Sequence, residues 1–189
     1  MRLGYMLAIT GIAWAAGAAS IQIRDIDNRL LNLFRPLGKA NVLFFVSSDC
    51  PISNSYAPEI QRLCEEYGTR GVGCWLLYED VDVKIPAVRK HLSEYHFGGI
   101  PAVLDTQRKI ANQARATVTP EAVVIDARGE IRYRGRIDNF YAALGKPRQQ
   151  VTAHDLRDAL DAVLAGRSVP NPDTKALGCY IVPPDILGK

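Results

Sequence analysis

The sequence predicts an α/β fold with a mixed central sheet that is covered by helices on both faces. Three observations support this prediction. The apolar run over residues 42–46 is continuous, as expected of a buried strand. Strand-like and helix-like segments then alternate along the chain, which favours a sheet covered on both sides. Hairpin signals at residues 21–33 and 121–135 make the sheet mixed.

Each further element follows from its own pattern. Apolar residues recur at helical spacing from Ile52 to Tyr67, and Pro58 inside this pattern should kink the helix. In the last predicted helix, Thr152 and Asp155 are placed as a capping box and Gly166 as the stop. The remaining predicted elements are strands over 73–78, 102–104, 121–126 and 131–135, and helices over 86–95 and 108–116.

Composition bounds the class of protein. The 189 residues are 48% apolar and 23% charged, which indicates a globular chain with the length of one domain. The net charge of +3 is spread along the sequence, and Glu130 interrupts the most basic stretch, residues 128–136. We therefore expect no nucleic-acid partner.

The first residues differ from the rest of the chain. Arg2 is followed by a run of apolar and small residues over 3–19, and the next charge is Arg24. A basic start, an apolar run and small residues at the end predict a secretory signal peptide over residues 1–19. The alternative is an uncleaved membrane anchor. Either way we expect an exported protein, periplasmic or secreted, in which disulfides persist.

The mature chain divides into two parts. Residues 20–166 contain all the predicted strands and helices and form the expected domain. Residues 167–189 form an irregular, Pro-rich tail that carries Cys179. We see no internal repeat in either part.

Cys50 is the strongest candidate for a reactive group. It follows the buried strand and opens a helix, where free backbone N–H groups and the helix dipole stabilise a thiolate and lower the thiol pKa. Pro51 suits the first helical position. Asp49 would oppose thiolate formation if it is close, or could relay a proton. A cysteine between a loop and Pro51 should be accessible, whereas the alternative is an inert buried residue.

These motifs resemble the thioredoxin-like superfamily, in particular its redoxin (AhpC/TSA-like) branch of extracytoplasmic thiol–disulfide oxidoreductases and peroxiredoxin relatives. The resemblance covers residues 21–166. It rests on the strand at 42–46, on Cys50-Pro51-Ile52-Ser53 with Pro58 behind it, and on Val118-Thr119-Pro120 with the hairpin that follows. It implies a thioredoxin-like fold with an N-terminal hairpin and a redoxin-type strand–helix insertion over residues 79–116.

The resemblance also implies roles for site residues. Pro120 should be cis and face Cys50, with Thr119 beside it in a substrate-facing loop that leaves backbone groups free for an extended substrate. Ser53 stands where the family's C-x-x-C motif has its second cysteine, so it can hydrogen-bond or cap but cannot resolve a mixed disulfide. Ser47, Asp49, Pro51 and Ser53 are therefore expected to tune the site.

Peroxidase chemistry is an alternative within the same family. Ser47 matches the hydroxyl position of the peroxiredoxin motif P-x-x-x-T/S-x-x-C, but Leu43 replaces its proline. No residue is identifiable as the peroxide-activating arginine. A lone thiolate could still be oxidised to a sulfenic acid and then need a partner thiol.

Three further cysteines leave several pairings open. Cys179 is the candidate resolving thiol for Cys50, and the alternative is a structural staple from Cys179 to Cys50 or Cys64. Cys64 lies in the predicted helix and Cys74 in the next strand, and both are interpreted first as core residues. They could also pair with each other, which requires Cα atoms within about 7 Å.

The expected function is an oxidoreductase and antioxidant protein that acts on thiols and disulfides, with peroxide as a possible substrate. Partners would be protein thiols or disulfides, or small thiols and peroxides, with an unidentified electron donor or acceptor. No cofactor and no metal are expected. The competing class is a copper- or other metal-binding chaperone that uses Cys50, Cys179 and a histidine, although His91 and His96 have ordinary surface spacing. A structurally disulfide-bonded domain without enzyme activity is the third interpretation.

Overall fold

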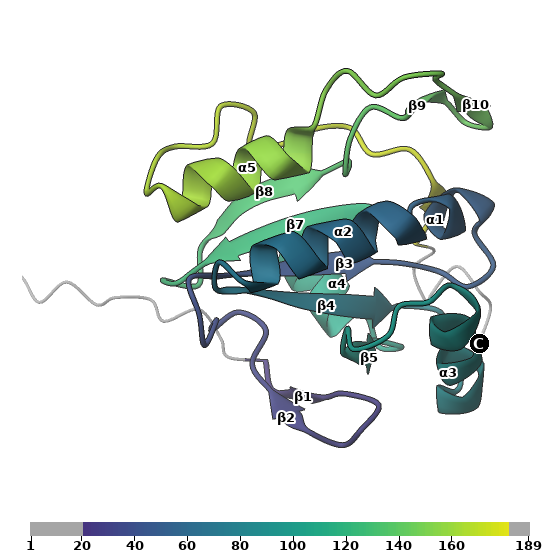
Figure 1. The fold of residues 1–189 in the computed structure, drawn as a ribbon. Helices are drawn as coiled ribbons and strands as arrows, with labels where there is room; N and C mark the ends of the chain where they lie inside the picture. Colours follow the sequence, from purple (N-terminus) through teal and green to yellow (C-terminus); the bar gives the residue numbers. More distant parts are fainter. Residues whose placement is uncertain (1–20, 182–189) are drawn as a thin grey trace, which may run out of the picture.

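The structure, a computed structural model, describes residues 21–181 (Figure 1). The predicted signal peptide, residues 1–19, lies outside the described residues. Within them, no helix has the length and apolar character needed to cross a membrane.

A five-stranded mixed sheet forms the centre of the molecule. Its order is β5 (Ala102–Leu104), β4 (Val72–Tyr78), β3 (Ala40–Phe45), β7 (Glu121–Asp126) and β8 (Ile131–Gly135). The first three strands are parallel, whereas β7 is antiparallel to β3 and β8 is antiparallel to β7. The predicted mixed α/β fold of thioredoxin type is confirmed, because alternating βα units place parallel strands side by side and a hairpin completes the sheet.

Five helices accompany this sheet within residues 21–181. They are α1 (Pro51–Ser55), α2 (Ala57–Gly68), α3 (Ile85–Glu94), α4 (Lys109–Ala114) and α5 (Asp155–Leu164). Helices α2 and α5 cover one face and α4 lies behind the sheet (Figure 1). Both faces are therefore covered, as expected of strands that are buried along their whole length, such as β3.

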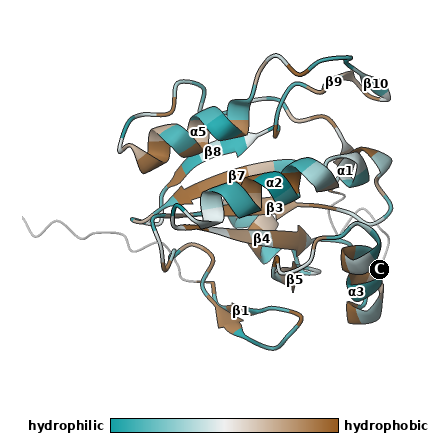
Figure 2. Ribbon diagram, in the orientation of Figure 1, coloured by the Kyte–Doolittle hydropathy of each residue, from teal (hydrophilic) through white to brown (hydrophobic). Residues whose placement is uncertain are grey.

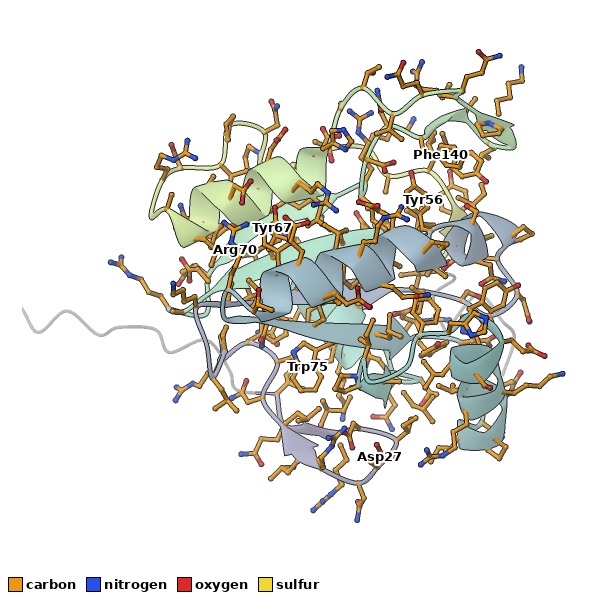
Figure 3. The ribbon with its side chains drawn as sticks, viewed as in Figure 1. Asp27, Tyr56, Tyr67, Arg70, Trp75 and Phe140 are labelled. Atoms are coloured by element: carbon orange, nitrogen blue, oxygen red, sulfur yellow. A yellow bond between two sulfur atoms is a disulfide. The ribbon has the colours of Figure 1, made fainter. Side chains whose placement is uncertain are left out.

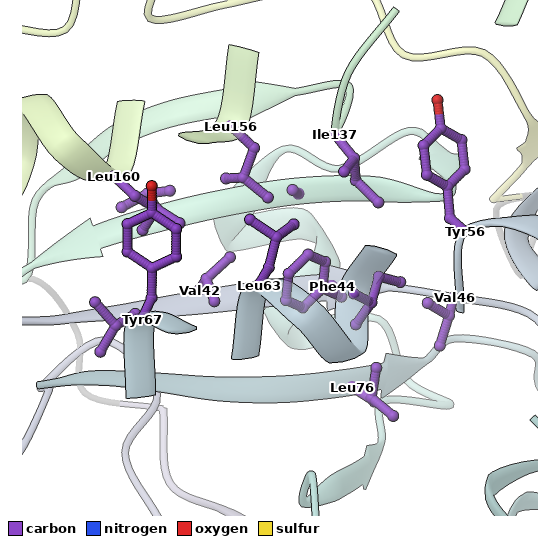
Figure 4. Close-up of a cluster of buried hydrophobic side chains, with 14 of the residues drawn as sticks. Val42, Phe44, Val46, Tyr56, Leu63, Tyr67, Leu76, Ile137, Leu156 and Leu160 are labelled. Atoms are coloured by element: carbon purple, nitrogen blue, oxygen red, sulfur yellow. The ribbon is translucent and has the colours of Figure 1, made fainter. Parts of the chain in front are cut away.

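Two apolar clusters fill the space between the layers. Figure 4 shows the first, in which Val42 and Phe44 of β3 contact side chains of α2 and α5. The second lies on the opposite face, where Leu43 and Phe45 meet Ile110 of α4. Figure 2 shows the same pattern as apolar strands beneath helices that carry polar residues. The alternation of side chains along β3 thus supplies both clusters.

Helix α2 is tied to α5 at the edge of the first cluster. The Tyr67 ring is buried, its hydroxyl contacts Asp161, and the Arg70 guanidinium lies 4.7 Å from the ring centroid (Figure 3). Arg70 also pairs with Asp161 at 2.8 Å. The guanidinium thus lies over the face of a core aromatic ring.

The predicted kink in the first helix is an interruption. The helix ends at Ser55 and resumes at Ala57, with Tyr56 between the two segments. Pro58 is the second residue of α2, where its missing N–H needs no helical acceptor.

The predicted capping box of α5 is wrong, although its predicted stop is confirmed. His154 precedes the helix and makes no capping hydrogen bond. The Thr152 hydroxyl instead accepts from Asn139 at 2.8 Å, and Asp155 binds Arg136 at 2.8 Å. Gly166, with φ of 66°, follows the last turn in the left-handed conformation that favours glycine.

Three short antiparallel pairs lie outside the main sheet. The pair of β1 (Ile23–Arg24) and β2 (Leu30–Leu31) is the predicted N-terminal hairpin. A second pair joins β9 (Tyr141–Ala143) to β10 (Lys146–Pro147). The third pair joins Cys179 and Tyr180 to Thr119 and Val118 and brings the tail to the candidate site.

Candidate active site

Cys50 lies at the carboxyl end of β3, directly before α1. Its backbone is extended, with φ of −93° and ψ of 108°, and Pro51 takes the first helical position. No side chain caps this helix start, which leaves its positive end available to the Cys50 sulfur. Such a position stabilises a thiolate when the sulfur is reduced.

A disulfide joins Cys50 to Cys179 across 129 residues, with a Cα–Cα distance of 6.1 Å. The prediction that Cys50 is accessible is wrong in this oxidised state, because the residue is only 1% exposed. The Cys50 sulfur faces the Thr119 carbonyl oxygen at 3.2 Å, and the bond to the tail covers it further. Cys179 is exposed. One sulfur of the bond therefore belongs to a buried residue and the other to a surface residue.

The tail reaches Cys50 as a short strand. Strand β11 (Cys179–Tyr180) pairs antiparallel with β6 (Val118–Thr119), and the Ile181 N–H donates to the Thr117 carbonyl at 2.9 Å. Gly178 permits this approach, because a Cβ there would lie 2.0 Å from the Thr119 carbonyl oxygen. The tail thus occupies the backbone edge that the resemblance assigns to a substrate.

The tail is also fixed at a second place, near β8. The Arg134 N–H donates to the Pro172 carbonyl at 2.9 Å, and the Thr174 N–H donates back to Arg134 at 3.0 Å. The Thr174 hydroxyl contacts the Tyr133 hydroxyl at 2.6 Å. These contacts explain why a segment without helix or strand patterning has a defined path.

The Thr119–Pro120 bond is cis, as the resemblance implies. Both residues are buried. The contact between the Thr119 carbonyl and the Cys50 sulfur places this loop against the cysteine, although the two lie 69 residues apart in sequence. In the sequence, only the family resemblance predicts that Thr119 and Pro120 lie near Cys50.

The loop before Cys50 is held by serine hydroxyls. The Ser53 hydroxyl accepts from the Ser47 N–H at 3.2 Å, and the Ser47 hydroxyl accepts from the Asp49 N–H at 3.4 Å. Asp49 is exposed and its carboxylate accepts from the Ser48 hydroxyl at 3.3 Å. Ser53 is buried and therefore positions the loop from within.

A buried chain of hydrogen bonds supports the same loop. The Asn54 amide donates to the Ser48 carbonyl at 2.8 Å, and its oxygen lies 2.9 Å from His91 Nε2. His91 Nδ1 lies 2.8 Å from the Tyr78 hydroxyl. Burial lowers the pKa of His91, so the neutral ring accepts from Tyr78 and donates to Asn54.

The expectation that His91 lies at the surface is wrong, because the side chain is 3% exposed. Its spacing carried the signal: His91 shares a helical face with Val88, Leu92 and Tyr95. Its ring lies 4.7 Å from that of Tyr95. The apolar neighbours on that face explain the burial of the imidazole.

Two buried charged residues near Cys179 carried no sequence signal. Glu79 directly follows β4, and Arg108 directly precedes α4. Both line a cavity of about 230 Å³ together with Ser47, Thr119 and Cys179. Their burial depends on the tail and on the end of β4, which are far apart in sequence.

The other two cysteines form a second disulfide. Cys64 of α2 and Cys74 of β4 have Cα atoms 5.8 Å apart and are separated by only 10 residues. Both side chains pack against the first apolar cluster, as expected of core residues, and the alternative that the two cysteines pair with each other also holds. The bond ties α2 to β4 because these elements are consecutive and packed together.

The metal-chaperone alternative receives no support from the geometry. Among residues 21–181, no three or more His, Cys, Asp or Glu side chains are grouped so that they could hold a metal ion. The two sulfurs beside Thr119 are bonded to each other. A third ligand from a histidine is not placed with them.

Known proteins share the sequence pattern and the fold of this chain. A family model described as the AhpC/TSA family matches residues 16–134. The chain belongs to the AhpC/TSA family. Membership confirms the predicted redoxin branch and an oxidoreductase that acts on thiols or disulfides. A search of curated proteins found no match.

Solved structures share the fold of this AhpC/TSA chain. An uncharacterized conserved protein from Geobacillus kaustophilus is 24% identical with a TM-score of 0.74, covering 87% of this chain and 88% of that one. A hypothetical protein from Sinorhizobium meliloti has the same identity and TM-score, with coverages of 91% and 95%. A secreted Mycobacterium tuberculosis disulfide oxidoreductase, homologous to E. coli DsbE, is 15% identical with a TM-score of 0.53, covering 78% and 96%.

Proposed function

We propose that this AhpC/TSA protein is an extracytoplasmic thiol–disulfide oxidoreductase whose redox couple is Cys50 and Cys179. One observation carries the proposal: the helix-start cysteine is bonded to an exposed cysteine on a tail strand that lies against the cis-proline loop. A bond needed only as a staple has no reason to end at a helix start, a position that stabilises a thiolate.

The reduced protein would act on a substrate disulfide in two steps. The Cys50 thiolate attacks one substrate sulfur, forms a mixed disulfide, and releases the other substrate sulfur as a thiolate. The Cys179 thiolate then attacks the Cys50 sulfur, which releases the second substrate thiolate and forms the Cys50–Cys179 bond. Two electrons pass from the protein to the substrate, and the reverse sequence oxidises a substrate dithiol.

The surroundings fit this chemistry. Thr119 and Pro120 form the loop that faces the substrate, and release of the tail from β6 frees its backbone edge for an extended peptide. Ser47, Asp49 and Ser53 hold the loop that carries Cys50, and Pro51 starts the helix. Protein thiols and disulfides are therefore the proposed partners.

Export is part of the proposal. The N-terminal pattern of the sequence predicts a signal peptide, and the described residues carry all four cysteines in disulfides, which persist outside the cytoplasm. The Mycobacterium tuberculosis neighbour is a secreted protein. We assign residues 20–166 to the redox domain and 167–189 to its resolving tail.

Two single variants and one control test the couple. With a disulfide-bonded peptide as substrate, Cys50→Ser should abolish turnover. Cys179→Ser should stop after the first step and accumulate a mixed disulfide on Cys50, visible by mass spectrometry. The double variant Cys64→Ala/Cys74→Ala should retain turnover, because the Cys64 and Cys74 sulfurs take no part in the exchange. Full turnover by Cys50→Ser would refute the proposal.

A further inference from the structure

The cavity beside Cys179 is lined by the buried side chain of Arg108, together with Glu79 and the exposed Asp80. Arg108 is 5% exposed, and no ion pair joins it to a described residue. Its Nε reaches only the Glu79 carbonyl, at 3.4 Å, and its Nη1 is buried without a hydrogen-bond partner. A buried guanidinium without a charged partner is unfavourable, so an anion from outside would be favoured there.

Glu79 does not supply that anion. Its carboxyl group is 4% exposed, and Oε1 lacks a hydrogen-bond partner. Burial raises the pKa of Glu79 well above its usual range, and nearby Asp105 and Asp80 raise it further, against the opposing effect of Arg108. Ionisation of Glu79 is therefore disfavoured, and its side chain forms no ion pair with that of Arg108.

Arg108 has a φ of 55°, in the left-handed region of the backbone. Asp105 holds this turn, with its carbonyl accepting from the Arg108 N–H at 2.6 Å and its carboxylate accepting from Ala111 at 2.8 Å. The turn places the guanidinium in the wall of the cavity that Cys179 also lines.

We propose that this cavity binds a small thiol that bears a carboxylate, and that this thiol reduces the Cys50–Cys179 bond. The carboxylate would pair with Arg108, whose planar fork suits two parallel N–H···O bonds. A volume of about 230 Å³ lies below the roughly 300–1,000 Å³ of sites for drug-sized ligands, so the ligand is small. This inference rests on the proposed function and names its electron donor.

The step balances with two molecules of the thiol. The first, as a thiolate, attacks the Cys179 sulfur, because Cys179 is the exposed partner. The Cys50–Cys179 bond breaks, its electron pair leaves on Cys50, and a mixed disulfide forms on Cys179. A second thiolate attacks the donor's sulfur in that mixed disulfide, which yields the small-molecule disulfide and the Cys179 thiolate.

The test compares 3-mercaptopropionate, which has a carboxylate, with neutral 2-mercaptoethanol. Reduction of Cys50–Cys179 in the full mature chain is followed by acid quench, alkylation and mass spectrometry, with rates normalised to thiolate concentration. The charged thiol should be at least about tenfold faster, as expected of a hydrogen-bonded charge pair. Arg108→Gln should remove this preference, so that the two thiols react at rates within about twofold of each other, whereas the matched surface variant Lys109→Gln should keep the preference.

The wild-type protein provides a second test that is independent of folding in the variants. Propionate, which has no thiol, should slow reduction by 3-mercaptopropionate but not by 2-mercaptoethanol. Equal rates for the two thiols, with no effect of propionate, would overturn the subsite and leave the redox couple intact. A Cys50–Cys179 bond that neither thiol reduces in the folded protein would overturn the proposed function itself.

Discussion

Gly178 offers a direct test of how the tail controls the redox couple. A Cβ at this position would lie 2.0 Å from the Thr119 carbonyl oxygen and 3.0 Å from the Pro120 nitrogen. These are backbone atoms of a buried loop, so they cannot move aside as a flexible side chain would. Gly178→Ala should therefore push the tail away from β6 while leaving the sheet and both helical faces unchanged.

The magnitude follows from the hydrogen bonds at stake. The tail pairs with β6 at two positions, and Ile181 adds a bond of 2.9 Å to Thr117. Losing two of these bonds, at about 1 kcal/mol each, weakens the oxidised form by about 2 kcal/mol, or about 30-fold in the equilibrium constant. For a two-electron couple this is about 40 mV. The reduction potential of Cys50–Cys179 should become more positive by that amount, because the oxidised form loses the pairing.

The assay is equilibration with a thiol–disulfide buffer, followed by trapping and mass spectrometry of the Cys50–Cys179 pair. Gly98→Ala is the matched control, since a Cβ there meets nothing within 4 Å. Its potential should equal that of the wild type. An unchanged potential in Gly178→Ala would show that the pairing with β6 does not hold the tail, and the argument for the tail strand would fail.

Four other outcomes follow from the structure. Replacing both Cys64 and Cys74 by alanine should lower the free energy of unfolding by about 2.7 kcal/mol in denaturant titrations, the chain-entropy value for a 10-residue separation. Glu79→Gln should gain stability over the wild type as the pH rises above 4.5, because the raised pKa means that ionisation opposes folding; equal pH profiles would contradict this. The contribution of neutral His91 to the free energy of unfolding should be complete above pH 6.5 and fall below it, since the pKa of His91 is lowered on folding. Asn54→Ala should raise the alkylation rate of reduced Cys50, because Asn54 holds the loop that carries this cysteine.

Local pattern was sufficient for the elements of this fold. The apolar run before Cys50 became β3, and the alternation of strands and helices became a covered sheet, because burial on both faces demands continuous apolar residues. The hairpin around residues 127–129 and the stop at Gly166 are also local, since both depend on a backbone conformation that glycine adopts readily. The capping box failed because Asn139 and Arg136, distant in sequence, bind the two capping candidates.

By itself, the sequence determined the fold class and the placement of a cysteine at a helix start behind a buried strand. Only the tertiary structure decided the pairing of the four cysteines, since a disulfide depends on Cα distances between segments up to 129 residues apart. The burial of Glu79, His91 and Arg108 was decided in the same way. A charged or polar side chain is buried by the elements that fold over it, and those elements are not its neighbours in the chain.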